Sequence, residues 1–123
     1  DGEFILVVDD EPSIRAVADR ILTRHGYRVA TAADGQEALE RWREHRAELD
    51  AIITDVAMPG MDGPELIAAL RADGADVPII VASGYVTDEG AGRLLEVATE
   101  FFVSKPFTAE TLLTTLRGVL VGR

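Results

Sequence analysis

Acidic residues stand where two apolar runs end. Asp9 and Asp10 follow the run at residues 4–8, and Asp55 follows the run at residues 51–54. If both runs are strands of one parallel sheet, their carboxyl ends meet at one edge and bring the three carboxylates together. Like charges that close together need compensation, and an all-oxygen ligand set suits Mg²⁺. The residues therefore predict a Mg²⁺ site, with Asp9 and Asp10 as a metal-binding pair.

Two more polar side chains follow later apolar runs. Ser83 comes after residues 79–82, and Lys105 comes shortly after residues 101–103. A serine hydroxyl and a lysine ammonium both suit phosphoryl oxygens. Phosphoryl transfer depends on positioning and charge neutralisation, and an aspartate can be its nucleophile. We interpret Asp55, which stands alone after its run, as that nucleophile.

Taken singly, these residues have ordinary alternatives. Asp9 and Asp10 can belong to a turn that caps a helix, and Ser83 before a glycine is common turn chemistry. Lys105 alone is most simply a surface lysine. The two histidines, His25 and His45, fall at predicted helix ends and receive no catalytic role. Only the joint arrangement of the polar residues favours chemistry.

Helical patterns separate the apolar runs. They are expected at about residues 12–25, 34–45, 62–73 and 88–98, and a last one includes residues 112–120. Such alternation predicts an α/β fold, a doubly wound parallel sheet of five strands with helices on both faces. Residues 28–31 are half polar and suit an edge strand, which favours the strand order 2-1-3-4-5 of flavodoxin-like sheets.

Bulk properties limit the function classes. The chain has 123 residues, and we expect residues 1–123 to form one domain. A net charge of −10 argues against direct nucleic-acid binding. Cysteines are absent from the sequence, so disulfides and thiolate metal sites are excluded. We see neither a signal peptide nor a run long enough for membrane insertion, and we expect a cytoplasmic domain.

The joint motifs resemble the receiver domains of response regulators in two-component signalling. The resemblance spans essentially the whole chain, and four segments carry it: Val7-Val8-Asp9-Asp10-Glu11, Asp55 with Met58-Pro59-Gly60-Met61-Asp62-Gly63, Ser83-Gly84, and Lys105-Pro106-Phe107. It implies the (βα)5 receiver fold. It also implies that Asp55 accepts a phosphoryl group from a histidine kinase or a histidine phosphotransfer domain.

The resemblance also assigns roles to individual residues. It implies direct Mg²⁺ ligation by Asp10 and Asp55, ligation through water by Asp9, and a backbone carbonyl ligand from Ala57. Ser83 and Phe102 are implied as switch residues. Many receivers carry tyrosine at the position of Phe102, so a switch here works by packing alone. The Lys105–Pro106 peptide is expected to be cis, as in the family.

Partners and output follow only in outline from the resemblance. The output surface is expected at the face formed by the fourth helix, the fifth strand and the fifth helix. Formation of a homodimer through the fourth and fifth helices is a further alternative. Ser83-Gly84-Tyr85 is similar to receivers attached to sensor kinases, which hints at a hybrid-kinase origin; a free-standing regulator is the alternative.

Three other function classes fit less well. A phosphatase of the haloacid-dehalogenase type needs a second aspartate two residues after its nucleophile, but this chain has Ala57 there. A pseudo-receiver usually lacks the acidic pair, the acceptor or the lysine, and this chain keeps all of them. A flavin-binding electron carrier shares the topology but needs a phosphate-binding loop after the first strand, and we see no convincing loop of that kind here. We therefore expect a phosphorylated switch and not a turnover enzyme.

Overall fold

The computed structural model describes residues 2–56, 58, 60–83, 101–104 and 107–121. In chain order its elements are β1 (Phe4–Val8), α1 (Pro12–Arg24), β2 (Arg28–Ala32), α2 (Gly35–His45), β3 (Leu49–Asp55), α3 (Gly63–Ala72), β4 (Ile79–Ser83), β5 (Phe101–Ser104) and α5 (Ala109–Val121). The helix predicted at about residues 88–98 lies outside the described residues.

The strands form one parallel sheet in the order β2-β1-β3-β4-β5, as predicted. All five residues of β1 are buried, which suits its unbroken apolar sequence. In β2, by contrast, only Ala32 is fully buried, as expected of an edge strand. β3 begins two residues earlier than predicted, because Leu49 is buried and the Asp50 carboxylate accepts a hydrogen bond from the Phe4 N–H at 2.8 Å.

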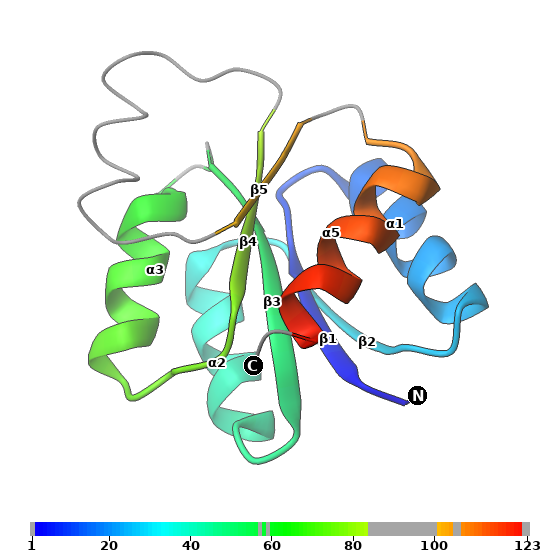
Figure 1. Cartoon of the computed structure of the whole chain (residues 1–123). Helices are drawn as coiled ribbons and strands as arrows, with labels where there is room; N and C mark the ends of the chain where they lie inside the picture. The colour runs from blue at the N-terminus through cyan, green and yellow to red at the C-terminus, as the bar shows by residue number, and fades with distance from the viewer. Residues whose placement is uncertain (1, 57, 59, 84–100, 105–106, 122–123) are drawn as a thin grey trace.

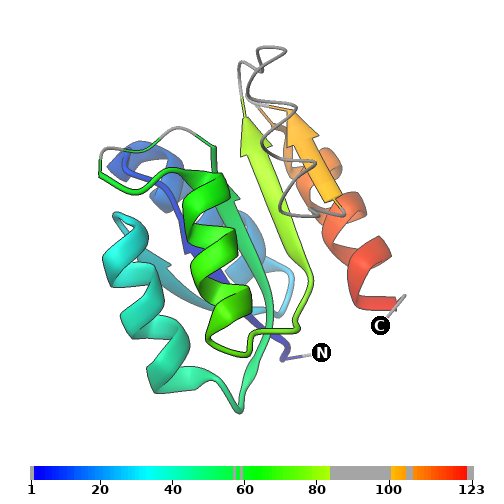
Figure 2. The ribbon, with the colours of Figure 1, turned by 90° about the vertical axis from the view of Figure 1, so that its left-hand side faces the viewer.

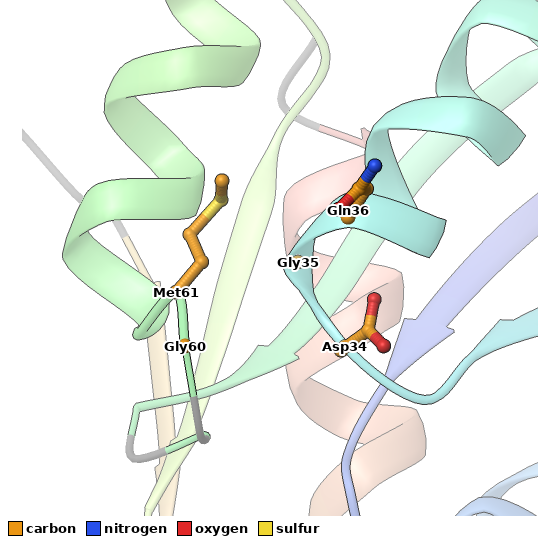
Figure 3. Close-up of a pocket in the computed structure, with 5 residues that line it drawn as sticks. All are labelled: Asp34, Gly35, Gln36, Gly60 and Met61. Carbon is orange, nitrogen blue, oxygen red and sulfur yellow. The ribbon is translucent and has the colours of Figure 1, made fainter.

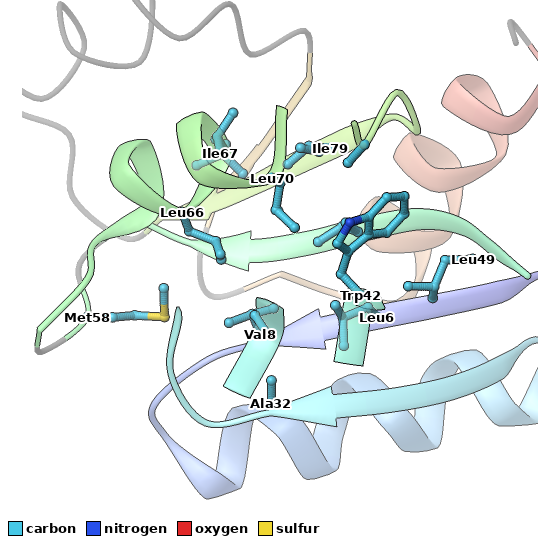
Figure 4. Packing of buried hydrophobic residues seen from close by; sticks show 14 of the residues in the cluster. Leu6, Val8, Ala32, Trp42, Leu49, Met58, Leu66, Ile67, Leu70 and Ile79 are labelled. Atoms are coloured by element: carbon cyan, nitrogen blue, oxygen red, sulfur yellow. The ribbon is translucent and has the colours of Figure 1, made fainter. Parts of the chain in front are cut away.

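The helices cover the two faces of this sheet (Figures 1 and 2). One face packs against α2 and α3, and Figure 4 shows part of this core, including Leu6, Val8, Trp42, Leu66, Ile67 and Leu70. The opposite face packs against α1 and α5 through residues such as Ile5, Ile53, Leu22, Leu112 and Leu116. Alternate residues of β1 therefore enter different cores, as the two-residue period of a strand requires.

Helix ends follow the signals in the sequence. Asp62 and Glu65, three residues apart, form a capping box at the start of α3. Asp34 caps α2 by accepting a hydrogen bond from the Glu37 N–H at 2.8 Å. Gly26, with a φ of 89°, follows the C-cap of α1. No helix within the described ranges is long and apolar enough to cross a membrane.

A polar cluster joins the C-terminal ends of α2 and α3. The Asp73 carboxylate accepts hydrogen bonds from Trp42 Nε1 at 3.1 Å and Arg46 Nη2 at 2.8 Å, and Arg43 Nε lies 3.3 Å away. Desolvation opposes ionisation of Asp73, but the hydrogen bond and charge of Arg43, then the charge of Arg46, outweigh it and lower the pKa of Asp73. The ionised carboxylate thus helps to hold the two helices together.

Because the folded state lowers the pKa of Asp73, its contribution to stability is present above the unfolded-state pKa and is lost as the pH falls through the folded-state value. We expect Asp73→Asn to lower the free energy of unfolding at pH 7 and to approach the parent in acid. Urea unfolding followed by the fluorescence of Trp42, the single tryptophan, measures this. Asp76→Asn, at an exposed position nearby, is the matched control. A stability gap between Asp73→Asn and the parent that does not change with pH would contradict the account.

Candidate functional site

The register of the sheet brings the ends of β1 and β3 to the same level. Val8 pairs with Thr54, so Asp9 and Asp55 occupy the next positions along neighbouring strands. Asp55 in turn pairs with Ala82, and Ser83 pairs with Ser104 at the ends of β4 and β5. The parallel sheet therefore collects these strand ends at one edge, where α/β sheets bind ligands.

Three carboxylates lie together at this edge. Asp9, Asp10 and Asp55 each offer an oxygen within 4.8 Å of the others. Asp9 and Asp55 are buried, with 2% and 8% of their surfaces exposed, whereas Asp10 is exposed. The cluster thus has two fixed members against the core and one that faces solvent, as a site with an accessible side requires.

Asp9 is held by its backbone and its side chain. Its N–H donates to the Ala32 carbonyl at 3.1 Å, which extends the pairing of β1 and β2 by one bond. Its Oδ1 accepts from the Glu11 N–H at 2.9 Å, and its carbonyl accepts from Arg15 Nη1 at 2.7 Å. Glu11 is the N-cap of α1, so the start of this helix and the placement of the carboxylate are coupled.

The loop after Asp55 is tightly packed against the start of α3. Asp55 Oδ1 accepts from the Val56 N–H at 2.9 Å, and the Val56 carbonyl accepts from the Gly63 N–H at 2.6 Å. A Cβ on Gly63 would lie 2.6 Å from the Asp55 carbonyl oxygen and 2.9 Å from the Val56 Cα. Met58 is buried in the core beneath the loop. Only glycine allows α3 to begin this close to Asp55.

The donor set fits a hard divalent cation. It consists of carboxylate oxygens, which Mg²⁺ prefers, and one of its members is open to solvent for bound water. Three negative charges at this separation repel one another, and a bound cation removes that repulsion. The described part of the chain thus contains an acidic cluster whose ligand atoms suit Mg²⁺.

The remaining predicted site residues are placed only in part. The backbones of Ser83 and Phe102 lie at the end of β4 and within β5, but their side chains are outside the described part of the structure. Ala57, Lys105 and Pro106 lie outside it altogether. Their predicted roles as carbonyl ligand, phosphoryl-binding cation and cis-peptide residue therefore stay predictions.

A separate pocket of about 350 Å³ lies beside the acidic edge, between the start of α2 and the loop before α3. It is lined by Asp34, Gly35, Gln36, Gly60 and Met61 (Figure 3). A Cβ on Gly35 would lie 2.7 Å from the Met61 sulfur, so glycine permits the close approach of these two segments. None of the three clustered carboxylates lines this pocket.

Two residues of the site had no predicted role. Arg15 reaches the Asp9 carbonyl from α1, and no motif in the sequence indicated this contact. Gly63 stood within a recognised motif, but its close approach to Asp55 depends on the path of the loop. A glycine directly after the N-cap residue Asp62 was the available signal.

Comparisons with known proteins agree with this geometry. Residues 5–117 match the family model of the response regulator receiver domain. The chain is 41% identical over 116 residues to the sensor kinase CckA of Brucella abortus, covering 94% of this chain and 12% of CckA. It spans half or less of the length of the first curated relatives it matches.

Solved structures share the fold over nearly the whole chain. The chemotaxis protein CheY4 of Vibrio cholerae matches with a TM-score of 0.90 and 38% identity, over 97% of this chain and 99% of CheY4. A chain of the CheX–CheY–BeF3–Mg²⁺ complex of Borrelia burgdorferi matches with a TM-score of 0.86 and 26% identity, over 94% of this chain and 87% of that one. This chain therefore belongs to the response-regulator receiver family of two-component signalling, whose members are phosphoacceptor switches.

Proposed function

We propose that this domain accepts a phosphoryl group on Asp55 in a Mg²⁺-dependent reaction and thereby changes an output surface. The observation that carries the proposal is the cluster of Asp9, Asp10 and Asp55 at the carboxyl edge of the sheet. Asp55 is the acceptor because it ends the central strand β3, whereas Asp9 and Asp10 form an adjacent pair suited to the metal.

The chain's own residues set the position of the nucleophile. The Val56 N–H holds one carboxylate oxygen of Asp55, and the contact of Val56 with Gly63 fixes the loop that follows. The Asp55 carboxylate attacks the phosphorus of a donor phosphohistidine, so an O–P bond forms and the N–P bond breaks. The histidine side chain is the leaving group, and it takes up a proton to become neutral histidine. Pre-organised geometry supplies much of the rate in such transfers.

Asp9, Asp10 and Asp55 would hold the Mg²⁺ ion, together with the carbonyl of Ala57 that the family resemblance implies. When bound, Mg²⁺ would supply positive charge against the phosphoryl oxygens. Lys105 would add a second cation, and Ser83 a hydrogen bond. In this proposal the domain catalyses only its own phosphorylation and slow dephosphorylation, and it turns over no external substrate.

The donor would be a histidine kinase or a histidine phosphotransfer domain. Two observations support this choice: the 41% identity to CckA, which is named a sensor kinase, and the family itself. The chemical change at Asp55 would favour a second conformation through Ser83 and Phe102, because a ligand shifts an equilibrium only by contacting the two states differently. The output surface would lie on the face formed by the predicted fourth helix, β5 and α5. Two copies of the domain could also dimerise through this face.

Phosphorylation with a small donor tests this proposal. We expect the protein to gain one phosphoryl group, seen by intact mass, when incubated with acetyl phosphate and Mg²⁺. The gain should disappear when Mg²⁺ is chelated and in Asp55→Asn. Since some receivers take phosphate only from protein donors, a beryllofluoride titration accompanies the assay. Failure of both would contradict the proposal and favour a pseudo-receiver.

A further inference from the structure

Arg15 contacts the acidic pair from the second turn of α1. Its Nη1 donates a hydrogen bond to the Asp9 carbonyl at 2.7 Å, at the short end of the range for N–H···O bonds, as expected when the donor is charged. The side chain is partly buried. We propose that Arg15 is a positioning residue that holds the Asp9–Asp10 peptide in the orientation needed to bind Mg²⁺. This inference rests on the metal site proposed above.

The peptide plane explains how Arg15 acts on Asp10. The Asp9 carbonyl and the Asp10 nitrogen belong to one planar unit, so fixing the carbonyl also fixes the direction in which the chain enters Asp10. The Asp9 N–H is bonded to Ala32, which anchors the other side of the residue. Asp10 is exposed, so packing constrains it less than it constrains the buried Asp9.

The bond from Arg15 uses a main-chain oxygen and no carboxylate oxygen. The positive charge of the Arg15 guanidinium near the site, however, repels a divalent cation. Positioning and electrostatics therefore predict opposite effects when Arg15 is removed, and the sign of the change in Mg²⁺ affinity separates them.

Calorimetric titration of the full chain with Mg²⁺ alone makes this measurement. We expect Arg15→Met to raise the Kd for Mg²⁺ about tenfold, the lower end of what loss of a residue supporting a metal ligand costs. Arg15→Lys keeps the charge and can donate one hydrogen bond to the Asp9 carbonyl from a shorter side chain, so its Kd should lie between those of the parent and Arg15→Met. Arg20→Met removes the same charge from an exposed position of α1 and should bind Mg²⁺ as well as the parent or slightly better.

The outcomes separate this inference from the proposed function. A Kd in Arg15→Met that equals or falls below the parental value overturns the role of Arg15 but leaves the metal site intact. A parent that binds no Mg²⁺ contradicts both. Thermal unfolding of each metal-free variant shows whether it is folded. If Arg15→Met is unfolded, Arg15→Ala, which also removes the guanidinium, is titrated in its place, and a Kd at or below the parental value there overturns the inference.

Discussion

In Asp10→Asn, Mg²⁺ binding should weaken by about 100-fold or more, while the metal-free protein becomes slightly more stable. Loss of a residue that only supports a metal ligand already costs about 10–100-fold in affinity, and Asp10 is a proposed direct ligand. Without metal, the substitution removes one of three carboxylates whose oxygens lie within 4.8 Å. Two charges about 4 Å apart repel by about 1 kcal/mol in water, which sets the expected gain in stability.

Thermal unfolding with and without Mg²⁺ tests both halves of this prediction. The parent should be stabilised as Mg²⁺ is added, because the ion binds the folded state alone, and Asp10→Asn should not respond. Asp76→Asn removes the same charge from an exposed position in the connection between α3 and β4, and it should respond like the parent. An Asp10→Asn protein that Mg²⁺ stabilises as strongly as the parent would remove Asp10 from the metal site.

Gly63→Ala should destabilise the protein by about 1–3 kcal/mol and slow phosphorylation about tenfold or more. The added Cβ would meet the Asp55 carbonyl oxygen at 2.6 Å and the Val56 Cα at 2.9 Å, and both neighbours are main-chain atoms that cannot simply rotate away. Overpacking of this kind costs about 1–3 kcal/mol. Because the clash falls on Asp55 itself, it also displaces the proposed nucleophile, and a displacement of about 1 Å can cost about 100-fold in rate.

Gly118→Ala is the matched control for this prediction. Gly118 is an exposed residue in the interior of α5, and a Cβ there would meet no atom within 4 Å. The same substitution should therefore stabilise the protein by about 0.5–1 kcal/mol, because alanine is the better helix former. Urea unfolding curves give both free energies. A Gly63→Ala protein with the same free energy of unfolding as the parent would contradict the close packing of α3 against the end of β3.

The sheet and the acidic cluster follow from local sequence. The apolar run of β1 and the half-polar β2 were sufficient to place one strand inside the sheet and the other at its edge. The carboxylates came with the strands, because Asp9 and Asp55 stand at their carboxyl ends and parallel strands share that edge. Hydrophobic periodicity and the rules of sheet topology were therefore sufficient to predict the position of the candidate site without any knowledge of tertiary contacts.

The contacts that refine the site do not follow from local sequence. The early start of β3 depends on a hydrogen bond between Phe4 and Asp50, residues 46 positions apart. The bond from Arg15 to Asp9 depends on how α1 leaves the sheet, and the role of Gly63 depends on how closely α3 returns to β3. Each is a consequence of how neighbouring elements pack, which residue spacing alone does not specify.

The most direct test of the account is to locate the phosphoryl group on the chain. After treatment with acetyl phosphate and Mg²⁺, borohydride reduction converts an aspartyl phosphate to homoserine, and peptide mass mapping then identifies the modified residue. The account predicts homoserine at position 55 alone, and none when Mg²⁺ is withheld. Homoserine at position 9 or 10, or a stable phosphoryl group on a serine or threonine, would contradict the assignment of Asp55 as the acceptor.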